Sequence, residues 1–311
     1  MYRFLLTRVM GLIFVLFSVT FLTFIFGYFA PGDPIRLMMG THFDPVLYKS
    51  LRHEYGLDVP WWQQYFNFVA NALHGTFGLS FHYQEREAWD VLKVGLPYSI
   101  ELGLESFAVT LIIGIPAGII AALRANTYID TSISTIMLLL YSFPDLAIII
   151  GFQVLMVWLY QHNLPYLPVA GWDSWQSRIG PVLITGTTGV GYFSRLTKTS
   201  LLEVLGQDYV RTARSKGLIE RIVVSRHALR NALLPLVTVI GPSLAFIVTG
   251  VFLTEQLFNI PGVSSITLDA IFQQDFPILQ ATTVLTCTSV VIFNMLTDIA
   301  YAIVDPRIRV E

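Results

Sequence analysis

Residues with catalytic or metal-binding potential are few in this sequence of 311 residues, and their spacing matches no enzyme motif. The sequence contains no His-Glu-x-x-His metal motif, no Gly-x-Ser-x-Gly nucleophile elbow and no paired aspartate motif. Its single cysteine, Cys287, can form neither an intrachain disulfide nor a cysteine metal cluster. We therefore expect no catalytic residue and no metal site in this chain.

Four of the six histidines lie between residues 31 and 97, but without the spacing of metal ligands. They are His42, His53, His74 and His82. This spread indicates surface or interface histidines. The same segment is rich in aromatic residues, which fit either the headgroup level of a membrane or contact with an external partner.

A few ionisable residues lie within or beside apolar stretches, namely Glu101, Glu105, Asp145 and Asp298. Charges in a membrane are costly and face a cavity or a polar partner, so a polar pathway for a peptide backbone is one interpretation. Placement of Glu101, Glu105 and Asp298 near headgroup depth is the alternative, and we favour it. The candidate pathway residues are Gln153, Thr249, Asn294 and Asp298, although packing roles would explain them equally well.

The composition places these residues in a membrane protein. Hydrophobic residues make up 54% of the chain and charged residues only 13%, and the mean hydropathy is +0.62. A soluble domain carries about 25% charged residues, so a soluble enzyme and a disordered chain are both disfavoured. The formal net charge of −2 argues against a nucleic-acid-binding protein. The predicted fold class is therefore an all-α polytopic membrane protein.

A helix crosses a bilayer with about 20 mostly apolar residues, and the uncharged stretches predict six such helices. We expect them at residues 9–30, 98–123, 131–160, 179–203, 231–256 and 278–304. The first is too long for a signal peptide and no small-residue cleavage site follows it, so it is a retained helix.

Lysine and arginine residues gather near one set of helix ends, which predicts the orientation of the chain. Residues 1–8 and 305–311 are then cytoplasmic termini. Residues 31–97 form an extracytoplasmic loop, and residues 203–230 form a basic cytoplasmic loop.

The basic loop carries the pattern of two helices separated by a glycine. Asp208 favours a helix start and Gly217 a helix stop, while a second helical stretch covers residues 219–234. Pro235 lies where the fifth span begins. Attraction to anionic lipid explains the charge of this loop but does not explain its helix–glycine–helix–proline order.

This loop resembles the cytoplasmic signature loop of ABC importer permeases, in the oligopeptide and dipeptide (B-type) branch. The similar stretches are Asp-Tyr-Val-Arg-Thr-Ala-Arg-Ser-Lys-Gly from Asp208 to Gly217 and Arg-His-Ala-Leu-Arg-Asn-Ala-Leu-Leu-Pro from Arg226 to Pro235. The general signature opens with Glu-Ala-Ala, whereas this chain has Arg211-Thr212-Ala213, so no role of that glutamate is transferred. Five further segments are similar in the same order, namely Ala30–Pro34, Tyr55–Pro60, His74–Ser80, Asn259–Val263 and Asp305–Arg309.

The resemblance implies a transmembrane subunit of a type I ABC importer, with residues 98–304 as the permease core. Such a subunit pairs with a homologous second permease and with two ATPase subunits, which bind ATP and magnesium. This chain itself binds no cofactor. An extracytoplasmic binding protein delivers peptides, and the location implied is the bacterial or archaeal cytoplasmic membrane.

The resemblance also assigns roles to residues. Coupling to an ATPase falls to Asp208, Tyr209, Arg211, Thr212, Ala213, Arg214, Lys216, Gly217 and Leu218. Proline and glycine residues offer places for bending, namely Pro235, Gly241 and Pro242.

The chain has no P-loop, so energy comes from a partner or an ion gradient. The glycines between residues 186 and 191 favour close helix packing.

Other functions remain compatible with parts of this pattern. The same architecture could move nickel, glutathione or oligosaccharide. A gradient-driven transporter would need intramembrane ion sites or broken helices in matching halves, and no clear internal repeat is present. An intramembrane enzyme would need one of the motifs that the sequence lacks.

Overall fold

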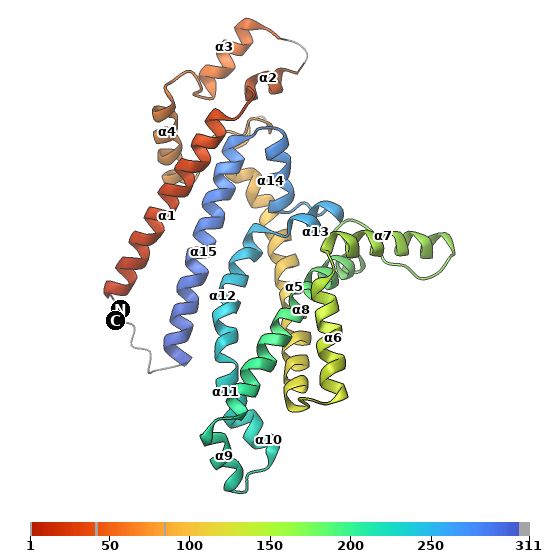
Figure 1. Ribbon diagram of the computed structural model, residues 1–311. Coiled ribbons are helices and arrows are strands. Elements are labelled where there is room, and N and C mark those ends of the chain that lie inside the picture. The colour runs from red at the N-terminus through yellow and green to blue at the C-terminus, as the bar shows by residue number, and fades with distance from the viewer. Residues whose placement is uncertain (1, 41–42, 84, 305–311) are drawn as a thin grey trace.

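The computed structural model describes residues 2–40, 43–83 and 85–304, and its elements are all helices. This confirms the all-α prediction. The long helices run side by side, with α9 and α10 at one end of the bundle and α2 and α3 at the other (Figure 1). Residues 305–311, predicted to form the cytoplasmic C-terminus, lie outside the described residues.

Five long helices form the bundle: α1 (Tyr2–Phe29), α5 (Ala88–Leu123), α8 (Trp175–Leu205), α12 (Leu234–Thr249) and α15 (Phe276–Val304). By length and hydropathy, four described segments could cross a membrane, namely Met10–Phe29, Ala88–Leu123, Leu234–Leu257 and Phe276–Ile299. A bent helix pair would raise the number to five. The count of six spans and the position of the termini stay predictions.

The predicted third span, residues 131–160, is not one helix. It consists of α6 (Tyr128–Ser142) and α7 (Asp145–Gln161), which meet at an angle of 91°. Phe143 is extended at the break because the ring of Pro144 disfavours helical geometry in the residue before it. The prediction of a continuous helix was wrong, and α7 instead projects sideways from the bundle (Figure 1).

The outer segment, residues 31–87, holds three short helices: α2 (Pro34–Met39), α3 (Pro45–Glu54) and α4 (Trp61–His74). Asp33 and Asp44 cap α2 and α3 by accepting hydrogen bonds from backbone N–H groups. Tyr65 of α4 packs its ring against aromatic side chains of α1, including Phe21 and Phe24. Packing therefore explains part of the aromatic content, although Trp61 and Trp62 are exposed.

Glycines allow α5 and α8 to approach closely, as the sequence predicted. A Cβ atom on Gly186 would lie 2.7 Å from the carbonyl oxygen of Ser106, and one on Gly118 would lie 2.4 Å from that of Ser194. Thr110 uses the space by donating a hydrogen bond of 2.6 Å to the Gly186 carbonyl. Gly191 plays the same part against α6, where a Cβ would meet the Met137 carbonyl at 2.5 Å.

The fifth span ends in a break followed by two short helices. Gly250, with φ +82°, separates α12 from α13 (Phe252–Leu257), and α14 (Val263–Phe272) follows before α15. The predicted span of residues 231–256 therefore combines the end of the inner loop, α12 and most of α13. Gly250 adopts this positive φ without strain because it has no Cβ atom.

One prediction concerns the contact between α12 and α15. A Cβ on Gly241 would lie 1.4 Å from Oγ1 of Thr297 and 2.7 Å from its Cβ, so Gly241→Ala forces the helices apart. We expect a loss of about 1–3 kcal/mol in stability, seen as a lower unfolding temperature of the purified protein in detergent. Adding Thr297→Ala should restore part of the loss.

The matched control is Gly151→Ala on α7, where a Cβ has nothing within 4 Å. It should leave the unfolding temperature unchanged or slightly higher, because alanine favours a helix over glycine. Equal effects of the two substitutions would contradict the close contact.

Candidate functional site: the inner helical segment

The inner segment, residues 206–233, folds as the two-part helical unit that the sequence predicted. It comprises α9 (Asp208–Ser215), α10 (Glu220–Ile222), a π-helical turn (Val223–Ala228) and α11 (Leu229–Ala232), which leads into α12. The second part is thus not a uniform α-helix. π-helical turns are rare and occur often at functional sites.

The first turn of α9 differs from the expected cap. Gln207 holds the capping position without a side-chain hydrogen bond, and Asp208 is the first helical residue. Asp208 still complements the helix dipole at that end, and its carboxylate lies 3.8 Å from the guanidinium of Arg211. Its effect on the helix is therefore electrostatic.

The turn after α9 is fixed by a glycine and an ion pair. Gly217 has φ +78°, and its N–H donates to the Arg214 carbonyl at 2.9 Å. Across this turn the Arg214 guanidinium donates two hydrogen bonds, of 3.1 and 2.7 Å, to the Glu220 carboxylate. These bonds lower the pKa of Glu220 and keep it ionised. An exposed pair of this kind contributes less than about 1 kcal/mol, so the glycine matters more.

The inner segment has one buried face and one exposed face. Val210 and Ala213 of α9 are buried in a cluster with Leu201 of α8, Ala122 of α5 and Val223 of the π-helical turn. The other coupling candidates are exposed, namely Asp208, Tyr209, Arg211, Thr212, Arg214, Lys216, Gly217 and Leu218. A predominantly basic surface is thus attached through an apolar contact to the ends of α5 and α8.

Ala213 is the coupling candidate that the structure places away from the surface, because its side chain belongs to the buried cluster. On the exposed side, the Asn231 side chain donates a hydrogen bond of 2.8 Å to the Tyr209 hydroxyl. This bond connects the start of α9 to α11.

The three bending candidates occupy different settings. Pro235 lies in the first turn of α12, where its missing N–H leaves no helix bond unmade. Gly241 and Pro242 lie within α12, which continues through both of them, and Gly241 serves the contact with α15. The break in this span is at Gly250. Bending at the three predicted residues stays a prediction.

The pathway candidates are not gathered at one place. Gln153 on α7 donates hydrogen bonds to the carbonyls of Val169 and Leu257, at 3.1 and 2.7 Å, so it connects α7 to α13. Asn294 and Asp298 are partly exposed on α15, on the opposite side of the bundle from α7 (Figure 1). Thr249 ends α12, where its hydroxyl donates to the Phe246 carbonyl.

Glu101 and Glu105 have a cationic partner. Arg178 of α8 lies 3.0 Å from a Glu101 oxygen and 3.6 Å from a Glu105 oxygen. The indole N–H of Trp172 also donates to Glu101 at 2.9 Å, and the Arg178 guanidinium lies over the Trp172 ring. These half-exposed groups form an ion-pair cluster between α5 and the start of α8.

A buried carboxylate, Glu255 on α13, was not predicted from the sequence. It is fully buried and accepts hydrogen bonds from the Ser99 hydroxyl at 2.7 Å and from the N–H groups of Val251 and Ser265 at 3.1 Å. It therefore ties the start of α13 and the start of α14 to α5. An isolated glutamate flanked by Gly250 and Gly262 was the available signal.

Asp275 is a second buried carboxylate that the sequence analysis missed. It accepts hydrogen bonds from the Ser80 hydroxyl and from the His82 N–H, the latter at 3.0 Å. Asp275 precedes α15, so these bonds attach the outer segment to the bundle.

A prediction follows for Glu255. Glu255→Gln replaces one of the two acceptor oxygens with an NH2 group, which cannot accept a hydrogen bond. One buried donor is then left unpaired. We expect a loss of about 1–3 kcal/mol in unfolding free energy, together with faster proteolysis of the segment between α12 and α15. Glu85→Gln, at an exposed position, is the control and should change neither. Unchanged proteolysis in Glu255→Gln would contradict the proposal that the Glu255 hydrogen bonds hold this segment in place.

Two family models together match nearly the whole chain. The family model described as "Binding-protein-dependent transport system inner membrane component" matches residues 114–310, and its N-terminal companion matches residues 1–103. The chain is 36% identical to the "Glutathione transport system permease protein GsiC" of Escherichia coli strain K12, over 99% of each chain. It is 35% identical to the protein of that name from Shigella flexneri serotype 5b, again over 99% of each.

Solved structures share the fold at lower sequence identity. Two inward-facing crystal forms of the MetNI methionine ABC transporter match with TM-scores of 0.55 and 0.57 at 16% identity. Each match covers 69% of this chain and 96% of the other. At this identity the likeness describes the arrangement of helices alone.

Proposed function

The chain belongs to the family of binding-protein-dependent transport system inner membrane components, and from that premise we propose that it forms half of a pathway for short peptides. It is an ABC importer permease subunit, and its family consists of multi-pass membrane proteins. Importers of this family work with a partner permease, ATPases and a binding protein. The bacterial cytoplasmic membrane is the proposed location.

Short peptides, including the tripeptide glutathione, are the proposed cargo. The support is the 36% identity over nearly full length to relatives named as glutathione permeases, together with the peptide-branch signature from Asp208 to Gly217. Nickel and oligosaccharide are the alternatives. Among the described residues, no group of three or more histidine, cysteine or acidic side chains could hold a metal ion.

The inner segment is the proposed contact with an ATPase. That ATPase, and not this chain, would bind ATP and magnesium. The observation that carries this proposal is its division into a buried apolar face, Val210 and Ala213, and an exposed basic face. A short helix of this kind fits a groove on a partner. Movement of that groove would pass through the buried cluster to α5 and α8.

The cargo proposal is tested by reconstituting the complete importer with its binding protein in proteoliposomes. We expect ATP-dependent uptake of glutathione or trialanine and none of nickel or maltotriose. ATP-dependent uptake of nickel or maltotriose alone would replace the proposed cargo. Uptake by this chain without ATPases, driven by a proton or sodium gradient, would overturn the ATP-driven proposal altogether.

The coupling proposal predicts a specific effect at Gly217. Gly217→Val places a β-branched residue at φ +78°, which costs about 1–2 kcal/mol, and should shift α10 relative to α9. We expect at least a tenfold loss of stimulation of ATP hydrolysis by the loaded binding protein, with normal membrane insertion. Gly217→Asp should give a smaller loss, because aspartate tolerates this conformation better. Deletion of residues 211–217 should abolish stimulation.

The matched control is Gly206→Val, in the same segment but with φ −80°, a conformation that valine adopts readily. It should preserve transport. Normal assembly and unchanged transport in Gly217→Val and in the deletion variant would refute the coupling role.

A further inference from the structure

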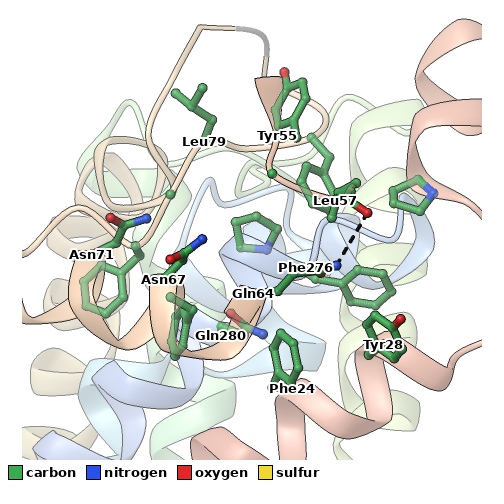
Figure 2. A pocket seen from close by; sticks show the side chains of 18 of the residues that line it. Phe24, Tyr28, Tyr55, Leu57, Gln64, Asn67, Asn71, Leu79, Phe276 and Gln280 are labelled. Carbon is green, nitrogen blue, oxygen red and sulfur yellow. Dashed lines mark hydrogen bonds between the residues drawn. The ribbon is translucent and has the colours of Figure 1, made fainter. Parts of the chain in front are cut away.

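A cavity of about 720 Å³ lies in the outer segment, at the end of the bundle opposite the inner segment. Its walls come from the end of α1, from α3 and α4, from residues 76–81 and from the start of α15. Figure 2 shows its side chains, with Phe24 and Tyr28 on one wall and Asn67 and Asn71 on another. Pockets that bind small ligands have volumes of roughly 300–1,000 Å³, so the size suits such a ligand.

Aromatic rings make up the apolar part of this outer pocket. They belong to Phe24, Tyr28, Tyr55, Phe68, Phe77, Phe81 and Phe276. Several of them also hold the pocket together, because Phe81 contacts both Tyr55 and Phe276 edge to face. The rings offer apolar surface to side chains of a ligand without depending on the ligand for their own position.

Carboxamides supply much of the neutral polar part. Gln280 is only 7% exposed, lines the cavity from α15, and has no hydrogen-bond partner among the described residues. Asn67 and Asn71, one helical turn apart on α4, also make no side-chain hydrogen bond within the described residues. The Gln280 amide lines the cavity and is available to pair with a polar ligand there. Each carboxamide can both donate and accept, as a peptide group requires.

Charged groups of both signs line the pocket, and they differ in how far they are already engaged. Arg52 donates to the Tyr48 hydroxyl and to the Leu57 carbonyl, while Asp33 accepts from Tyr48. Glu54 and Glu87 have no hydrogen bond or ion pair to another described side chain. Glu54 is exposed and Glu87 is half-buried, and both line the cavity, so either carboxylate can pair with the ammonium group of a ligand there.

We propose that this outer pocket binds a short peptide with a free amino terminus. In this site the ammonium group lies near Glu54 or Glu87, peptide groups pair with Gln280, Asn67 and Asn71, and apolar side chains contact the rings. The proposal goes beyond the import function, because it assigns this chain a ligand site of its own outside the bundle. A loop of a binding protein offers the same peptide chemistry, but the uncommitted carboxylates favour a free terminus.

The test is equilibrium binding of radiolabelled trialanine to the purified importer without its binding protein. We expect saturable binding that N-acetylation of trialanine weakens at least tenfold, since the ammonium group is lost. Gln280→Leu and the double variant Glu54→Gln/Glu87→Gln should each weaken binding at least fivefold. Gln63→Leu, exposed on α4 and outside the pocket, and Glu85→Gln are the matched controls and should bind as the unmodified protein does.

Four results would overturn the proposal. These are no saturable binding, equal binding of acetylated trialanine, unchanged binding in both pocket variants, or displacement by maltotriose. A pocket that binds no free peptide, but whose variants weaken docking of the binding protein, would instead hold a loop of that protein. Uptake assays separate this proposal from the import function, because absent uptake with intact trialanine binding would contradict import alone.

Discussion

The close approach of α5 and α8 is the contact on which the rest of the molecule depends. Two backbones can come this near only where Cβ atoms are missing, and Gly118 and Gly186 supply these places along the helix pair. Thr110 then bonds directly to a backbone carbonyl across the contact. In a membrane, where burial of apolar groups from water cannot drive helix association, such packing and hydrogen bonding must hold the helices together.

Each end of this helix pair supports one of the two parts for which we propose a partner or ligand. At one end, Ala122 and Leu201 receive Val210 of the inner segment in a shared buried cluster. Toward the other end, Ser99 of α5 donates to Glu255 and so ties α13 to this helix. A movement of the inner segment therefore acts on the same two helices that support the outer half of the bundle. This continuity is the route by which the proposed coupling to an ATPase would reach the outer half of the bundle.

Local backbone chemistry made some features predictable from the sequence. Gly217 follows α9 as predicted, because a glycine adopts the positive φ of a helix stop without strain. The glycines of α8 face neighbouring helices, also as predicted. The 91° break before Asp145 was missed because an apolar run continues through Pro144, and hydropathy does not record direction. Glu255 was missed because the hydroxyl donor Ser99 comes from a distant part of the chain, which pattern and spacing cannot bring together with Glu255.

Site-specific crosslinking tests the central claim, that α9 receives the movement of an ATPase, most directly. Cys287 would first be replaced by serine, and a single cysteine then introduced at Thr212 on the exposed face of α9. Tyr128, 86% exposed at the start of α6, is the comparison position. The account predicts a crosslink from position 212 to an ATPase subunit, with a yield that changes on ATP binding, and none from position 128. No crosslink from position 212 in the assembled importer would contradict it.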